Sequence, residues 1–321
     1  MPAAAPISID WPGRHAVLFV HGVGNATPGE YASLVASVRA LLGDEHQDVA
    51  MYELYYDIYN DWLTAKMPLS SGITSLLTSM KEELGTDELG SAAAEFAGDI
   101  VWPVLNLAGR AIVREAYLAQ LKQIVRDGIR AGVHPWNQKI SIICHSLGCF
   151  HTYEALHAAA NEPQHALRPL SNGTTFQNVV FMASPVQLIR QTCSRIGVAV
   201  PNPEDLATLR GESLSIPGQP SVSGYFEPSV KNWVSISGEL DPVCGYLFRR
   251  KVDRCFMTMD GQETIIDDQR LLDISSKVEL ATRIRDARRE DGPPSIPVKN
   301  PHSWQGYIDR HTDKLRQWLT A

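Results

Sequence analysis

One stretch of the sequence presents a hydroxyl group, that of Ser146, in a setting where it could act as a nucleophile. The residues before it, 140–145, are mostly β-favouring, and residues 147–160 are rich in Leu, Ala, Phe and His without proline. The hydrophobic period therefore changes at Ser146, which predicts a strand, a tight turn and a helix with the serine at the apex. Such a turn lifts the hydroxyl clear of the backbone, and Gly148 leaves space for another segment to pass closely. A simpler interpretation is a serine that only caps a helix, a position that Ser favours.

A second candidate lies at the end of a buried strand near the start of the chain. Residues 15–20 form a continuous apolar run, as expected of a parallel strand covered on both faces, and they lead into His21-Gly-Val-Gly24. A loop at the carboxyl end of such a strand is where these sheets bind ligands. Two plainer interpretations are a simple turn and an incomplete phosphate-binding loop, because a bare G-x-G is weak evidence for phosphate.

The elements that would position these residues alternate between strand and helix, which predicts the α/β class with a mostly parallel, doubly wound sheet. The other predicted elements are a helix at 31–42, strands at 49–56, 176–183 and 232–238, a possible further strand at 252–259, and a final helix that ends near Leu319. A long helical region at 94–132, broken near Pro103, would cross over to the strand before Ser146.

We expect one domain over residues 1–321 with two excursions from the sheet. The first, a cap at 60–98, contains an amphipathic helix at 72–84 with apolar residues at helical spacing. That helix could be a mobile lid or a permanently packed layer, and periodicity does not separate these alternatives. The second excursion, 186–230, is irregular because it holds a span rich in Ser, Gly and Pro.

The serine motif, Cys144-x-Ser146-x-Gly148, resembles the G-x-S-x-G nucleophile elbow of the α/β-hydrolase family, with Cys144 in place of the first glycine. The resemblance implies an α/β-hydrolase fold. It also implies an oxyanion hole formed by the backbone N–H groups of Val23 and Leu147. His21, Gly22 and Gly24 would then line the substrate-binding loop.

The same resemblance implies the partners of the nucleophile. The family's catalytic acid lies just past a strand, which here is Asp241, and its general base lies before the last helix, which here is His302. The plainer interpretations are an Asp-Pro turn for Asp241 and a surface-loop histidine for His302. His311, within the predicted final helix, is a competing base.

A narrower resemblance covers mainly the second half of the chain. The order of Ala183-Ser-Pro-Val186, Asp241, Asp253, His302 and Asp309 is similar to that in intracellular phospholipases with a DDHD domain. This resemblance points toward phospholipid or other acyl esters.

Composition excludes several classes of partner. The net charge is −7 and no basic cluster with interleaved aromatic residues occurs, so we expect no nucleic-acid partner. The first residues lack a basic segment and a long apolar core, so we expect no secretory signal. The five cysteines form no C-x-x-C pair, which favours reduced thiols in the cytoplasm. The longest apolar stretch, 100–109, is too short to span a bilayer. The histidines near Ser146 lack metal-ligand spacing, so no metal site is expected.

These observations predict a serine hydrolase that cleaves carboxylic esters of lipids or other acyl compounds and needs no cofactor. Its partner would be a small-molecule or lipid ester, and peripheral contact with a membrane is compatible with an apolar cap. The sequence does not specify the oligomeric state. Two alternatives remain open: a thioesterase or serine peptidase with the same three residues, and a hydrolase-fold protein that binds a lipid or a partner without turnover.

Overall fold

The structure is a computed structural model of the 321-residue chain. It describes the parts that form the sheet and the helices packed on it. The described residues are 6–22, 32–44, 48–54, 107–161, 175–186, 189, 229–236, 256–257, 263–264, 304–310 and 312–320.

The centre of the fold is a five-stranded sheet in which every neighbouring pair is parallel. Its strands are β1 His15–Val20, β2 Val49–Leu54, β3 Lys139–His145, β4 Thr175–Met182 and β5 Ser229–Ile236. Their order across the sheet is β2-β1-β3-β4-β5. The predicted α/β class with a parallel sheet is confirmed.

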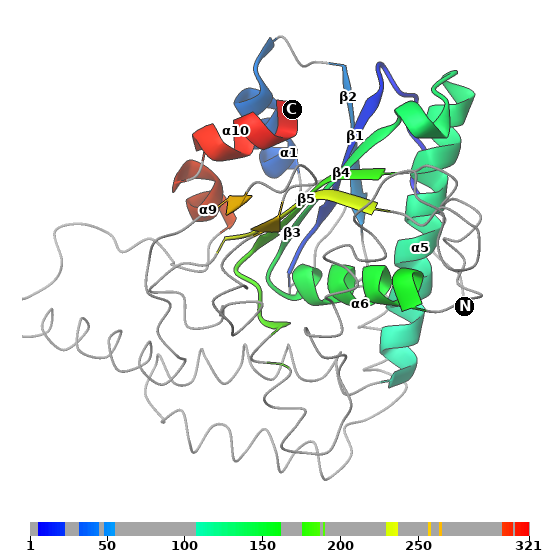
Figure 1. The fold of residues 1–321 in the computed structure, drawn as a ribbon, viewed down its shortest axis with the longest axis vertical. Coiled ribbons are helices and arrows are strands. Elements are labelled where there is room, and N and C mark those ends of the chain that lie inside the picture. Colours follow the sequence, from blue (N-terminus) through cyan, green and yellow to red (C-terminus); the bar gives the residue numbers. More distant parts are fainter. Residues whose placement is uncertain are drawn as a thin grey trace, which may run out of the picture.

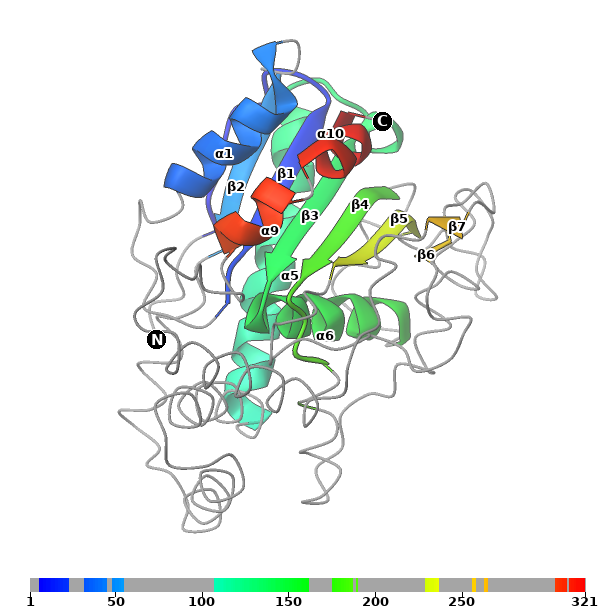
Figure 2. The ribbon, with the colours of Figure 1, turned by 90° about the vertical axis from the view of Figure 1, so that its left-hand side faces the viewer.

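Helices cover both faces of this sheet. The longer described helices are α1 Ala32–Leu42, α5 Leu107–Arg130, α6 Leu147–Asn161, α9 Trp304–Arg310 and α10 Thr312–Thr320. Figures 1 and 2 show α1, α9 and α10 on one face and α5 and α6 on the other. A parallel sheet covered in this way needs strands that are apolar on both sides, and five of the six residues of β1 are fully buried.

Most boundaries lie within a few residues of those predicted from the sequence, and two differ in substance. The predicted strand at 252–259 is represented by β6, Phe256–Met257, which pairs antiparallel with β7, Glu263–Thr264. The predicted final helix is two helices, and helix begins as early as Trp304. The Thr312 hydroxyl donates to the carbonyl oxygen of Ile308 at 3.0 Å, which satisfies one of the carbonyl groups left unpaired where α9 ends.

The predicted excursions fall largely outside the described residues. The cap at 60–98, including the amphipathic helix at 72–84, lies wholly outside them. Of the excursion at 186–230, the structure describes residues 186 and 189, and residues 229–230 already belong to β5. The connection from 94 to the start of α5 at Leu107 also lies outside the described residues.

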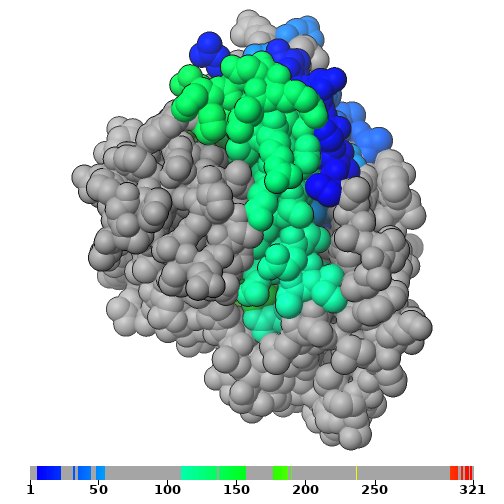
Figure 3. All heavy atoms as spheres, turned by 90° about the vertical axis from the view of Figure 1, so that its right-hand side faces the viewer, coloured from blue at the N-terminus to red at the C-terminus, as the bar shows by residue number. Residues whose placement is uncertain are grey.

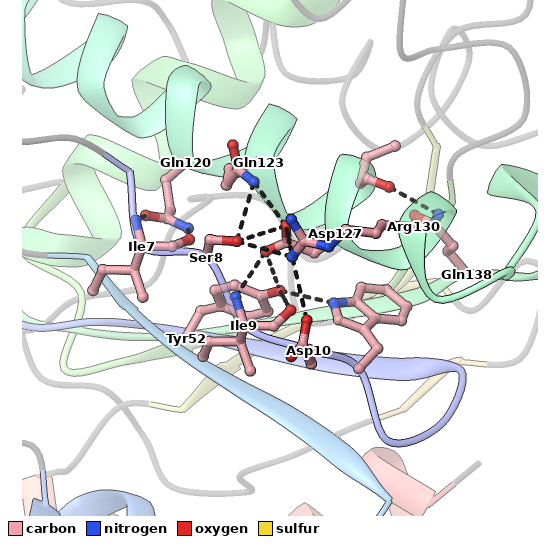
Figure 4. Close-up of polar contacts among 12 residues, drawn as sticks. Ile7, Ser8, Ile9, Asp10, Tyr52, Gln120, Gln123, Asp127, Arg130 and Gln138 are labelled. Atoms are coloured by element: carbon pink, nitrogen blue, oxygen red, sulfur yellow. Dashed lines mark hydrogen bonds and ion pairs between the residues drawn. The ribbon is translucent and has the colours of Figure 1, made fainter.

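The segment before β1 lies across α5 and is fixed there by side chains that bind its backbone. The Gln120 side chain accepts a hydrogen bond from the Ile7 N–H at 2.8 Å and donates one to the Ile7 carbonyl at 2.9 Å. The Asp127 carboxylate accepts from the Ile9 N–H and from the Ser8 hydroxyl, both at 2.9 Å. Figure 3 shows this blue segment beside α5, and Figure 4 shows the contacts. They fix the chain as it enters β1.

Asp127 is the centre of this network, although it is buried. Its carboxylate also accepts hydrogen bonds from Tyr52 at 2.8 Å, Gln123 at 2.7 Å and Arg130 at 2.8 Å, and the Trp11 indole donates to Tyr52 at 2.8 Å. Burial acts to raise the pKa of Asp127, but its hydrogen-bond donors outweigh burial and hold that pKa below its usual value. The same cluster raises the pKa of Tyr52, first through burial and then through its bond to Asp127.

Candidate functional site

The predicted site residues that the structure describes lie at the carboxyl ends of β1 and β3, which are neighbours in the sheet. The register pairs Val20, the last residue of β1, with Cys144 near the end of β3. From β1 the chain continues to β2 on one side, and from β3 it continues to β4 on the other. The strand order therefore reverses between β1 and β3, and the crevice outside such a switch point is the usual ligand site of open α/β sheets.

Ser146 occupies the turn between β3 and α6 in an unusual backbone conformation. Its φ is +53°, in the left-handed region that a non-glycine residue rarely adopts. An ordinary N-cap residue has a φ in the β region, so this conformation differs from that of a serine that only caps a helix. The Ser146 N–H donates to the carbonyl of Met182 at 3.0 Å, and the Ser146 carbonyl accepts from Cys149 at 3.0 Å. Strained turns of this kind recur at functional sites.

Two glycines allow the loop after β1 to lie directly against this turn. A Cβ on Gly22 would stand 2.5 Å from the Cβ of Ser146 and 3.1 Å from its Oγ. A Cβ on Gly148 would stand 2.2 Å from the carbonyl oxygen of His21 and 2.5 Å from that of Val20. Real Cβ atoms do not approach other atoms so closely, so both positions require glycine. Residues 21 and 22, which follow β1, therefore pack directly against the serine turn.

The structure describes four of the predicted site residues and brings them together. Ser146 and Leu147 are buried, Gly22 is buried against Ser146, and His21 is partly buried beside Gly148. Leu147 is the first residue of α6, where backbone N–H groups have no acceptor within the helix. The other predicted residues, Val23, Gly24, Asp241 and His302, lie outside the described residues, as does His311.

An aromatic cluster that the sequence analysis did not assign to the site surrounds the residue before Ser146. The ring of His145 lies 5.4 Å from that of Trp304 and 6.1 Å from that of Tyr307, measured between centroids. Trp304 also contacts Phe19 of β1, with centroids 6.3 Å apart. The spacing of Trp304 and Tyr307, three residues apart on α9, was the available signal, because residues so spaced share one helix face.

The two thiols that flank Ser146 lie in the core, where their Sγ atoms are bound to backbone carbonyl groups. Cys144 and Cys149 are fully buried, and their Sγ atoms donate to the carbonyls of Val180 at 3.2 Å and Met182 at 3.4 Å. Burial raises the pKa of the Cys149 thiol, and the neighbouring Cys144 adds to this effect. Only a thiolate is a strong nucleophile, so its raised pKa disfavours Cys149 as the nucleophile, and the hydroxyl of Ser146 is our candidate in this turn.

A buried polar group near the turn is held neutral. Burial, together with the charges of Arg110 and His21, lowers the pKa of His151 to about 3. Arg110 itself forms an ion pair with Glu154 and lies over the ring of Phe150, 5.6 Å from its centroid. His151 therefore carries no charge at neutral pH, and its low pKa does not suit the role of a general base there.

Within the part of the chain that the structure describes, no three His, Cys, Asp or Glu side chains gather where they could bind a metal ion. None of the described helices combines the length and the apolar character needed to cross a bilayer. Comparisons with models of protein families, with curated proteins and with solved structures found no match. The function is therefore inferred from the residues of this chain alone.

Proposed function

We propose that this chain is a serine hydrolase of the α/β-hydrolase type that cleaves carboxylic esters of lipids or other acyl compounds. The observation that carries the proposal is the left-handed Ser146, at φ +53°, with the loop after β1 packed against it. A serine on a strained strand-to-helix turn at a switch point is the arrangement that presents a nucleophile above an α/β sheet. In this proposal the Ser146 Oγ attacks the ester carbonyl carbon.

The oxyanion that forms in this attack would be bound by the N–H groups of Leu147 and Val23. Leu147 begins α6, where first-turn N–H groups are directed away from the helix and lack helical acceptors. Val23 follows Gly22, where an added Cβ would stand 3.1 Å from the Ser146 Oγ. Donors held in place before the reaction stabilise the developing charge without reorganising.

His302 is the proposed general base. One residue separates it from Trp304, so its Cα lies two Cα–Cα steps, or at most about 7.6 Å, from the Trp304 Cα. The Trp304 ring is in contact with His145, the neighbour of Ser146. An imidazole with an ordinary pKa near neutrality can take the hydroxyl proton and return it to the leaving alcohol.

Asp241 is the proposed acid that orients this imidazole. It follows β5 by five residues, and β5 is separated from the serine strand by β4 alone. Its carboxylate would accept the second imidazole N–H, which fixes the tautomer and stabilises the imidazolium. Water then attacks the acyl-serine ester by the same proton transfers, which releases the carboxylic acid and restores Ser146.

The proposed substrates carry a medium or long acyl chain. The apolar stripe predicted within 72–84 would cover such a chain, and each buried methylene contributes about 0.8 kcal/mol. Activity should therefore rise with acyl length from acetate to at least octanoate. A panel of ester, thioester and anilide substrates of equal acyl length separates an esterase from a thioesterase or a peptidase.

A fluorophosphonate probe tests the proposal directly. The wild type should be labelled, Ser146→Ala should not, and turnover should fall by about 10⁴-fold or more. Ser184→Ala is the matched control, because Ser184 is equally buried and follows the neighbouring strand β4. A folded wild type that resists labelling would contradict the proposal and favour a protein that binds without turnover.

A further inference from the structure

The first turn of α9 contacts both strands that end at the site. Trp304, the first residue of this helix, lies 5.4 Å from the His145 ring of β3, with the planes inclined by 44°, and 6.3 Å from the Phe19 ring of β1. Tyr307, one turn later, meets the same His145 ring edge-on. His145 is 8% exposed, so these aromatic contacts enclose the residue that precedes Ser146.

The rest of the C-terminal unit fixes α9 in this place. Gln305 accepts a hydrogen bond from Ser37 of α1 at 3.1 Å, and the Arg316 guanidinium donates to the Leu41 carbonyl at 2.6 Å. Buried apolar side chains support these polar contacts. They are those of Tyr307, Ile308, Leu315 and Leu319. The position of Trp304 is therefore set by packing against three elements of the fold, α1, β1 and β3.

The indole N–H of Trp304 gives a second observation. It is buried, and among the described residues no atom accepts a hydrogen bond from it. A buried donor is costly to leave unpaired, by about 1–3 kcal/mol, so the ring is held in place by its aromatic contacts despite this cost. The position of the side chain therefore depends on its ring contacts with His145 and Phe19.

We propose that Trp304 is a positioning residue for the reaction at Ser146: its ring, packed on His145, fixes the segment that carries His302 relative to the serine turn. The inference rests on the proposed function. A single residue joins Trp304 to His302, so a displacement of Trp304 is transmitted to His302 with little chain to absorb it. Trp304 contacts neither the substrate nor the reacting atoms, and its effect passes through His302.

The expected signature is a loss of kcat with little change in KM. A misplacement of a catalytic group by 1 Å can cost about 100-fold in rate, so Trp304→Ala should lower kcat about 100-fold. Because Trp304 would act on the proton transfer rather than on the bound substrate, KM should stay within about threefold of the wild type. Trp304→Phe keeps an aromatic ring on His145 and should retain kcat within about tenfold.

The experiment measures kcat, KM and the rate of fluorophosphonate labelling for wild type, Trp304→Ala and Trp304→Phe in the full chain. Trp11→Ala is the matched control: Trp11 is 7% exposed, precedes β1 at the opposite edge of the sheet, and donates to Tyr52. This control should lower the melting temperature while kcat of the folded protein stays within about twofold. If Trp304→Ala does not fold, Trp304→Leu replaces it, with kcat at least about tenfold below that of Trp304→Phe.

Two results would overturn the inference alone. One is a labelled wild type with a folded Trp304→Ala variant whose kcat and labelling rate are unchanged. The other is a Trp304→Phe variant as impaired as Trp304→Ala, because the ring would then not be what positions His302. An unlabelled wild type would instead overturn the proposed function, and this inference with it.

Discussion

Gly22 and Ser146, which belong to different strand ends, lie so close that a Cβ on the glycine would stand 2.5 Å from the serine Cβ. The contact joins the loop after β1 to the turn after β3, where the order of strands reverses. Both atoms would be Cβ atoms, whose positions the backbone fixes, so no change of rotamer can relieve the overlap. The geometry of the serine turn therefore depends on the absence of a side chain at residue 22.

Gly22→Ala should separate the loop from the turn and reduce activity. Because the new methyl group would overlap Ser146, one of the two backbones must move, and a shift of this size can cost about 100-fold in kcat. Ester turnover and thermal unfolding followed by circular dichroism measure the two effects. Gly43→Ala is the control, because Gly43 has φ +75° but open space around it. It should cost about 1 kcal/mol of stability and leave kcat unchanged.

Gly148→Ala should damage folding more than Gly22→Ala does. Its methyl group would meet the carbonyl oxygens of His21 and Val20 at 2.2 and 2.5 Å, which belong to the last residue of β1 and the residue after it. Forcing a strand and a helix apart in this way should lower the free energy of unfolding by about 3 kcal/mol. Urea denaturation measures this free energy. A denaturation midpoint equal to that of the wild type would contradict the close contact of Gly148 with Val20 and His21.

Asp127→Asn should loosen the N-terminal segment from α5 without affecting chemistry at the opposite edge of the sheet. Every group that contacts the carboxylate is a donor, so an amide would place its own N–H₂ against at least one of them. The loss should be about 3 kcal/mol in the free energy of unfolding. Tyr52→Phe removes one donor and should cost less. Proteolysis of the N-terminal segment, with kcat as the control, distinguishes local release from general unfolding.

We expect the Asp127 carboxylate to make a contribution to folding stability that is lost in acid. Because the folded-state pKa of Asp127 lies below its unfolded value of about 3.9, its contribution is fully present above that pH and is lost as pH falls through the folded-state pKa. Unfolding measured between pH 5 and pH 2.5 should show a steeper loss for the wild type than for Asp127→Asn. Parallel curves would mean that Asp127 does not carry this dependence.

We expect His151 to cause a separate loss of folding stability, which begins at a higher pH than that of Asp127. Its folded-state pKa of about 3 lies below the unfolded value of about 6.5, so the folded state resists protonation and stability falls as pH drops from 6.5 toward 3. By linkage, the free energy of unfolding at pH 5 should be about 2 kcal/mol lower than at high pH, where His151 is neutral in both states. His151→Gln should flatten the stability curve between pH 6.5 and pH 5. An unchanged slope in this range would contradict the neutral, buried histidine.

The sequence alone was sufficient to predict the strands and the helix around Ser146. The strand at 15–20, the change from strand to helix at Ser146 and the parallel sheet follow from hydrophobic period, which neighbouring residues determine locally. The division of the last helix was missed, because it depends on Thr312 binding carbonyl groups at the end of α9 rather than on apolar spacing. The α/β-hydrolase relationship and the roles of Asp241 and His302 stay predictions.

Only the tertiary structure decided which distant residues touch. Nothing local in the sequence indicates that Gly22 must accommodate Ser146, that Trp304 packs on His145, or that Asp127 holds the backbone of Ile9. These contacts join segments far apart in the chain, and they depend on the order of strands and on how helices pack on each face. Local periodicity fixes the type of each element, whereas the packing of elements against one another fixes the geometry on which the proposed chemistry depends.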